Sequence, residues 1–134
     1  VEPREETKAY EGRGETVLFV EDDTNMLRLG ERMLKGMGYA VHAFDSASEA
    51  LAFAKANKGA MDILITDVVM PEMSGRDLAE AMGEWCPEVR VLFMSGYTAN
   101  VIAHRGVLDE GVNFLQKPFS PHELAKKVRE VLES

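Results

Sequence analysis

Short apolar runs recur along the chain at intervals of about 23 residues, each the length of a β-strand. They occupy residues 17–20, 40–44, 63–66, 89–94 and 112–115. The first and third runs are apolar almost throughout, as strands buried on both faces of a parallel sheet must be. The second run and the fifth, which extends to Gln116, admit polar residues, as edge strands do. The pattern predicts five strands, two of them edges.

The segments between these runs show the three- and four-residue apolar spacing of amphipathic helices. The apolar sets are Met26, Leu29, Met33 and Met37; Ala47, Ala50, Leu51 and Ala54; Leu78, Ala81, Met82 and Trp85; and Leu124, Val128, Val131 and Leu132. A fourth helix, between the third and the last of these, is expected around 99–107. The last helix has a capping box, with Ser120 as N-cap, Pro121 at the first position and Glu123 at the third.

Strand and helix alternate five times, which predicts a (βα)5 domain with helices on both faces of a parallel sheet. The two polar runs at the edges favour the strand order 2-1-3-4-5, so the expected fold class is a doubly wound α/β three-layer sandwich. In such sheets ligands bind at the carboxyl ends of the strands, beside the point where the strand order reverses. Here that point lies between the first and third strands.

Length and composition bound the kind of protein. The chain has 134 residues, 46% of them hydrophobic and 28% charged, which suits one globular domain. Residues 1–15 are polar and are expected to form a linker or tail, with the domain at 16–134. The net charge of −8 argues against a nucleic-acid partner. A single cysteine, Cys86, fits a reducing compartment such as the cytoplasm, and no apolar run is long enough for a membrane span.

Acidic, hydroxyl and ammonium groups follow the strands whose carboxyl ends should meet. The residues are Glu21, Asp22 and Asp23 after the first run, Asp67 after the third, Ser95 after the fourth and Lys117 after the fifth. Each has an ordinary structural explanation: Asp23, for example, suits the N-cap of the next helix. Together they form a cluster of carboxylates, whose mutual repulsion a hard divalent cation such as Mg²⁺ would relieve.

An acid, a divalent cation, a lysine and a hydroxyl are the groups that phosphoryl transfer requires, because they neutralise or bind the oxygens of the transferred group. No glycine-rich phosphate loop follows the first strand, and no serine lies in an activated triad. Asp67 is the one acid at the centre of the predicted crevice. A carboxylate can carry a phosphoryl group covalently, so Asp67 is the candidate nucleophile.

Four motifs in this order and spacing closely resemble the receiver domain of two-component response regulators. They are "VLFVEDD" at 17–23, "DILITDVVMPEMSG" at 62–75, "VLFMSGYT" at 91–98 and "FLQKPF" at 114–119. The resemblance spans about residues 16–134 and implies a flavodoxin-like fold. It further implies a phosphoacceptor domain in a phosphorelay, whose partner is a histidine kinase or a histidine phosphotransfer domain. Such a domain promotes its own phosphorylation and is expected as a monomer or weak dimer.

The resemblance also implies roles for single residues. Asp67 corresponds to the phosphoacceptor, and Lys117 to the lysine that contacts the phosphoryl oxygens, before a proline whose peptide bond is usually cis. Glu21, Asp22, Asp67 and the backbone carbonyl of Val69 would bind Mg²⁺ or Mn²⁺, Asp22 directly and Glu21 through water.

Two further pairs of positions follow from the same resemblance. Ser95 and Phe114 occupy the switch positions, where Ser95 would move toward the phosphoryl group and Phe114 would rotate inward. That movement would repack the face of the fourth helix, fifth strand and fifth helix, although Phe114 lacks the hydroxyl of the more common tyrosine. Val69 and Tyr97 flank the phosphoryl position, and neither can orient a water molecule, so we predict a long-lived phosphoryl group.

The amino-acid sequence of residues 92–132 resembles the C-terminal receiver of hybrid sensor histidine kinases. A stand-alone single-domain regulator is the alternative for the parent protein. An aspartyl-phosphate phosphatase of the haloacid dehalogenase type is a rival, but it would require an acid where this chain has Val69. A degenerate receiver that serves only as a docking module is another rival, and the full set of catalytic positions argues against it.

Overall fold

In the part of the chain that the structure describes, the sheet runs through the middle and has five parallel strands. A computed structural model describes residues 10–98 and 111–134. The strands are β1 (Thr16–Val20), β2 (Ala40–Phe44), β3 (Ile63–Asp67), β4 (Arg90–Ser95) and β5 (Phe114–Gln116). Their order is β2-β1-β3-β4-β5, which confirms the predicted topology and both predicted edge strands.

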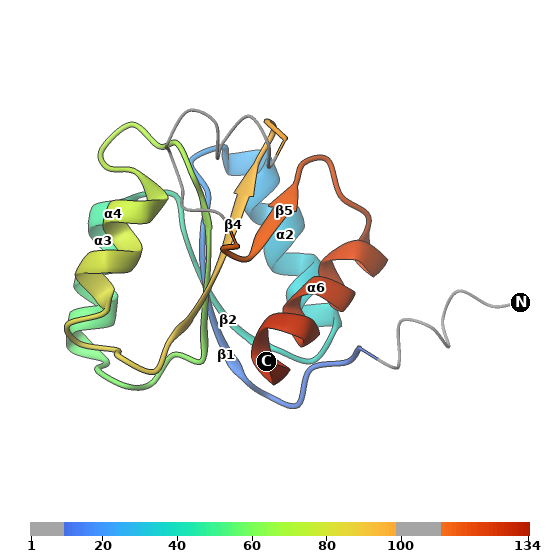
Figure 1. The fold of residues 1–134 in the computed structure, drawn as a ribbon, viewed down its shortest axis with the longest axis horizontal. Helices are drawn as coiled ribbons and strands as arrows, with labels where there is room; N and C mark the ends of the chain where they lie inside the picture. The colour runs from blue at the N-terminus through green and yellow to red at the C-terminus, as the bar shows by residue number, and fades with distance from the viewer. Residues whose placement is uncertain (1–9, 99–110) are drawn as a thin grey trace, which may run out of the picture.

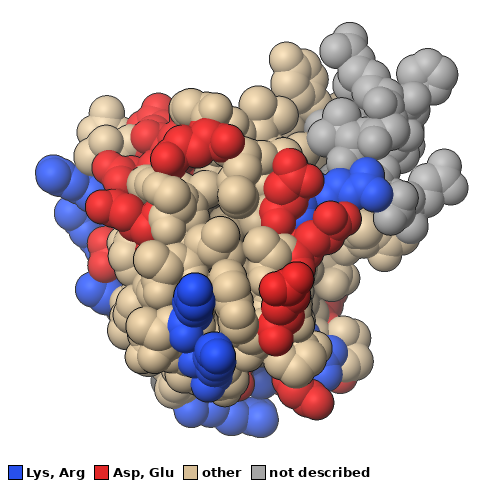
Figure 2. All heavy atoms as spheres, turned by 90° about the vertical axis from the view of Figure 1, so that its left-hand side faces the viewer, with Lys and Arg blue, Asp and Glu red and all other residues tan. Residues whose placement is uncertain are grey.

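Helices cover both faces of the sheet (Figure 1). On one face α2 (Thr24–Gly36) and α6 (Pro121–Glu133) share an apolar core with the strands, and on the other face α3 (Ala47–Ala56) and α4 (Gly75–Met82) form a second core. The surface over α3 and α4 carries acidic side chains among basic ones (Figure 2). The helix predicted around 99–107 lies outside the described residues.

The predicted helix starts are confirmed at both ends of the domain. The Asp23 carboxylate accepts hydrogen bonds from the backbone N–H groups of Asn25 and Met26, at 2.9 and 3.1 Å, and so caps α2. Ser120 and Glu123 form the reciprocal capping box at the start of α6. These bonds satisfy backbone donors that the first turn of a helix otherwise leaves unpaired.

The strand register decides which residues meet at the carboxyl edge. Val20 of β1 pairs with Thr66 of β3, and Asp67 pairs with Met94 of β4. Glu21, directly after Val20, therefore lies level with Asp67 on the neighbouring strand. The switch point of the sheet, between β1 and β3, is where these two acids are brought together.

The structure differs from the sequence prediction at strand ends. β4 extends one residue further, to Ser95, and β5 begins at Phe114 instead of 112. Gly111 has a φ of 85°, and the side chain of Asn113 donates to the carbonyl of Val91 at 3.1 Å. The backbone carbonyl of Asn113 still accepts a hydrogen bond from the N–H of Phe93 at 3.0 Å, so the contact with β4 begins one residue before the assigned strand.

The described part of the predicted linker lies against the domain. The backbone N–H groups of Gly12 and Gly14 donate to the carbonyls of Met37 and Gly38, at 2.7 and 3.0 Å. Arg129 of α6, buried to 6% exposure, pairs with Glu15 at 2.5 Å. Among the described residues no helix has both the length and the apolar character of a membrane span.

Candidate functional site

A cleft of about 240 Å³ opens at the carboxyl edge of β1, β3, β4 and β5. Its lining consists of Glu21, Asp22, Asp67, Val69, Met94, Ser95, Gly96, Tyr97 and Lys117. Every residue that the sequence nominated for phosphoryl transfer, metal binding or phosphoryl lifetime is in this set. Asp23, which caps α2, and the second switch residue, Phe114, lie outside it.

Three carboxylates and one ammonium group form the polar centre of the cleft. Oxygens of Glu21, Asp22 and Asp67 lie within 4.8 Å of one another. Asp22 is exposed, whereas Glu21 keeps only 2% exposure and Asp67 only 5%. The Nζ of Lys117 donates to both carboxylate oxygens of Glu21, at 3.0 and 3.2 Å, and forms a short ion pair with Oδ1 of Asp67. Lys117 therefore bridges the two buried acids.

Burial and the lysine act in opposite directions on Asp67. Burial raises the pKa of this carboxyl above its ordinary value, and the hydrogen bond and charge of Lys117 oppose that rise without cancelling it. When all three acids are ionised, one ammonium leaves two negative charges uncompensated, which is the charge of one divalent cation. Closely spaced carboxylate oxygens are also the ligands that Mg²⁺ prefers, so the residues present fit this ion.

The loop after β3 brings Val69 to the cleft. The backbone N–H of Gly75 donates to the carbonyl of Val68 at 2.8 Å, which closes the loop on itself. A Cβ on Gly75 would lie 2.0 Å from the carbonyl oxygen of Asp67, so only glycine allows this approach. The loop is thereby held directly behind the candidate phosphoacceptor.

Ser95 and Tyr97 occupy the opposite wall of the cleft. The Ser95 hydroxyl accepts a hydrogen bond from the backbone N–H of Tyr97 at 3.0 Å, and it keeps its own proton to donate to another oxygen. Val69 and Tyr97 are 67% and 58% exposed. Both stand at the mouth of the cleft, where a bound phosphoryl group would meet water.

Phe114 is the first residue of β5 and lies outside the lining of the cleft. It pairs with Phe93 of β4 and is half-buried against a small cluster of Phe93 and Val68. Val68 is the residue directly after Asp67. Phe114 therefore packs against a cluster that includes the neighbour of the candidate phosphoacceptor.

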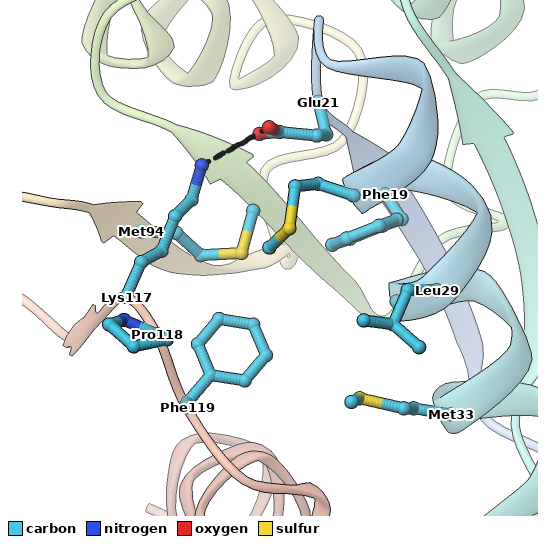
Figure 3. A pocket seen from close by; sticks show the side chains of 10 residues that line it. Phe19, Glu21, Leu29, Met33, Met94, Lys117, Pro118 and Phe119 are labelled. Atoms are coloured by element: carbon cyan, nitrogen blue, oxygen red, sulfur yellow. Dashed lines mark hydrogen bonds and ion pairs between the residues drawn. The ribbon is translucent and has the colours of Figure 1, made fainter.

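A second hollow, of about 130 Å³, lies beside the cleft and was missed by the sequence analysis. Figure 3 shows Leu29 and Met33 of α2 facing Pro118 and Phe119 of the β5–α6 connection, whose Lys117–Pro118 peptide is cis as the resemblance implied. Leu29 belongs to the apolar stripe of α2, yet it is 45% exposed. The exposure of Leu29 depends on where the β5–α6 connection lies, and the apolar spacing of a helix does not predict that position.

The hollow and the cleft share part of their lining. Glu21, Met94 and Lys117 line both of them. Lys117 points from the apolar hollow toward Glu21 (Figure 3). A partner that reached the cleft from this side would therefore pass over an apolar strip before it met the charged groups.

The strand order and the acidic cleft at its switch point place the protein in the flavodoxin-like class of doubly wound α/β domains. A family model described as the response regulator receiver domain matches residues 17–129, and the chain belongs to that family. It is a receiver domain of two-component signalling, a kind of domain that interacts with histidine kinases or phosphotransfer proteins.

Individual relatives agree with the family. The chain is 41% identical over 118 residues to the sensor kinase CckA of Brucella abortus, covering 88% of this chain and 12% of that protein. It is 31% identical to the response regulator receiver protein CpdR of the same organism, covering 87% of this chain and 95% of that protein. A crystal structure of the receiver domain of the hybrid histidine kinase CckA superimposes with a TM-score of 0.74 and 34% identity, covering 87% and 98%.

Proposed function

We propose that Asp67 accepts a phosphoryl group from a phosphohistidine of a histidine kinase or phosphotransfer domain. The observation that carries this proposal is the bridge of Lys117 between Glu21 and Asp67 inside an acidic cleft. A carboxylate oxygen of Asp67 forms the new bond to phosphorus, and the phosphorus–nitrogen bond of the donor breaks with its electron pair going to the imidazole. The imidazole takes a proton from solvent.

Glu21, Asp22, Asp67 and the backbone carbonyl of Val69 would hold Mg²⁺ in this proposal. Once bound, the ion would neutralise negative charge on the acids and on the transferred oxygens. Lys117, which pairs with both Glu21 and Asp67, contributes a second positive charge, and the Ser95 hydroxyl would donate to a phosphoryl oxygen. Each role is supported by the fact that these residues all line a single cleft.

The donor is proposed to dock along the hollow between α2 and the β5–α6 connection. A phosphohistidine side chain has to reach Asp67 from a protein surface, and the hollow lies beside the cleft and shares Glu21, Met94 and Lys117 with it. Leu29, Met33 and Phe119 give that surface an apolar core, as protein interfaces usually have. Exchange of Leu29 for Glu should slow transfer from a protein donor but leave phosphorylation by acetyl phosphate unchanged.

Phosphorylation is proposed to act through Ser95 and Phe114. Movement of Ser95 toward the phosphoryl group would open space for Phe114, which is half-buried against Phe93 and Val68. The surface that includes β5 and α6 would then change its packing for a partner. This is a shift between two packings of one domain.

The parent protein is proposed to be a hybrid sensor histidine kinase, on the strength of the likeness to CckA. The stand-alone alternative is supported by the likeness to CpdR, which the chain covers almost completely. The sequence upstream of Val1 distinguishes them: a kinase ATPase domain there supports the hybrid, and a start codon close to Val1 supports the stand-alone protein.

Transfer from a phosphorylated histidine donor tests the function. Wild-type protein with Mg²⁺ should gain one base-labile phosphoryl group, and protein in EDTA should gain none. The Asp67→Asn variant should also gain none. Release of inorganic phosphate from small phosphomonoesters would instead support the phosphatase rival, and normal partner binding without any phosphorylation would support a docking module.

A further inference from the structure

Glu72 lies in the loop between β3 and α4 and binds the start of α3. One of its carboxylate oxygens accepts a hydrogen bond from the Ser46 hydroxyl at 2.7 Å, and the other accepts one from the Ser48 hydroxyl at 3.0 Å. Ser46 is the N-cap of α3, and its oxygen also accepts from the backbone N–H of Glu49 at 3.3 Å. A single exposed carboxylate therefore joins two connections that are 24 residues apart or more.

The ionised form of Glu72 is the one that makes this contact. The hydroxyl of Ser46 and then that of Ser48 lower the pKa of the carboxyl below its ordinary value, and backbone N–H groups at the helix start add to the effect. A negative charge at the N-terminus of a helix is also favoured by the helix dipole. The contact is thus charged and fully formed at neutral pH.

The β1–α2 loop and the β3–α4 loop are both tied to the segment between the end of β2 and the start of α3. On one side the backbone N–H of Glu21 donates to the carbonyl of Phe44 at 3.1 Å, which ties the β1–α2 loop to the connection that precedes α3. On the other side Glu72 ties the β3–α4 loop to the same connection through Ser46. The two loops that carry Glu21 and Val69 are consequently braced against one common support.

We propose that Glu72 is a positioning residue for the metal ion. By fixing the β3–α4 loop to the start of α3, it would limit movement of the Val69 backbone relative to Glu21 and Asp22, which line the same cleft. Mg²⁺ tolerates little deviation from octahedral geometry, so a loop that moves freely binds it less tightly. The inference rests on the proposed function, because it assumes that these residues bind Mg²⁺.

The alternative is that Glu72 only stabilises α3. Ser46 already caps that helix without Glu72, so the two explanations predict different results. A stabilising role alone would lower the melting temperature and leave the affinity for Mg²⁺ unchanged. A positioning role lowers the affinity for Mg²⁺ even when the melting temperature without metal stays close to that of the wild type.

The test measures the affinity for Mg²⁺ by calorimetric titration, together with the melting temperature in EDTA. Glu72→Ala should weaken Mg²⁺ binding roughly tenfold, the lower end of the effect of losing groups that orient metal ligands. Ser48→Ala removes one of the two bonds and leaves the cap of α3 intact, so it should weaken binding by a smaller factor. The double variant should be no weaker than Glu72→Ala alone.

Glu49→Ala is the matched control, because it removes an exposed carboxylate from the first turn of α3. Its affinity for Mg²⁺ should stay close to that of the wild type. Equal weakening in this control would overturn the proposal in favour of a general charge effect. An unchanged affinity in Glu72→Ala would also overturn it. If the wild type itself failed to bind Mg²⁺, the proposed function would fail together with the inference.

Discussion

Replacement of Lys117 by methionine tests how the charges of the cleft are balanced. Lys117 bridges Glu21 and Asp67, whose side chains are 3% and 7% exposed. The variant keeps an unbranched side chain of similar length but leaves two nearly buried carboxylates without their cation. Removing one partner of a buried pair costs about 3–5 kcal/mol, and we expect about 3 because Lys117 is itself 19% exposed.

Mg²⁺ should restore much of this loss. The variant cleft has one more uncompensated negative charge, so it should bind Mg²⁺ more tightly than the wild type does. At saturating Mg²⁺, each tenfold gain in affinity adds about 1.4 kcal/mol to the free energy of unfolding. The stabilisation by Mg²⁺ should therefore be larger in Lys117→Met than in the wild type, although phosphorylation of Asp67 should be lost.

Urea unfolding followed by the fluorescence of Trp85, the only tryptophan in the sequence, measures both effects. The titrations are made in EDTA and in Mg²⁺. Lys35→Met is the matched control, because Lys35 is 57% exposed and pairs with Glu31 on the surface of α2. It should cost less than about 0.5 kcal/mol and show the Mg²⁺ response of the wild type. If Lys117→Met and the wild type were equally stable in EDTA, the claim that Lys117 compensates the charges of Glu21 and Asp67 would be refuted.

Three other predictions concern the same cleft. Burial raises the pKa of Asp67 in the folded protein, so the free energy of unfolding without metal should fall as pH rises from the ordinary aspartate pKa through the raised one. Asp67→Asn should abolish this fall and should be more stable than the wild type at neutral pH. Unfolding measured at several pH values checks both expectations. Gly75→Ala should lower the free energy of unfolding by about 2 kcal/mol or more and should weaken Mg²⁺ binding. The control Gly36→Ala, whose added Cβ meets nothing within 4 Å, should not be destabilising. Calorimetry measures the stability and the Mg²⁺ affinity of both variants. Val69→Asn combined with Tyr97→Ala should speed decay of the phosphoryl group after the donor is removed, and an unchanged decay rate would contradict the predicted long lifetime.

The strand order and the meeting of the acids could be predicted because they follow from local patterns. Apolar runs at regular spacing fix the number of strands, and the polar residues of β2 and β5 mark the edges of the sheet. The topology then brings the carboxyl ends of β1 and β3 together. Glu21 and Asp67 could be placed side by side from the sequence because each directly follows, or ends, one of these strands.

The contacts that depend on relative loop positions could not be predicted. The bonds from Ser46 and Ser48 to Glu72 join connections whose distance is decided by the packing of α3 on α4, which no short motif encodes. The exposure of Leu29 was missed for the same reason, because its apolar spacing is that of a core residue. The bridge of Lys117 to Glu21 was likewise missed, since the sequence suggested only a charge near Asp67.

The central claim is that Asp67 carries the phosphoryl group. The most direct measurement is reductive trapping of the acyl phosphate after incubation with a phosphohistidine donor and Mg²⁺, followed by peptide mapping with mass spectrometry. The account predicts a single modified residue, Asp67, in the wild type and no modified residue in Asp67→Asn. Modification at another residue, or undiminished modification of Asp67→Asn, would contradict it.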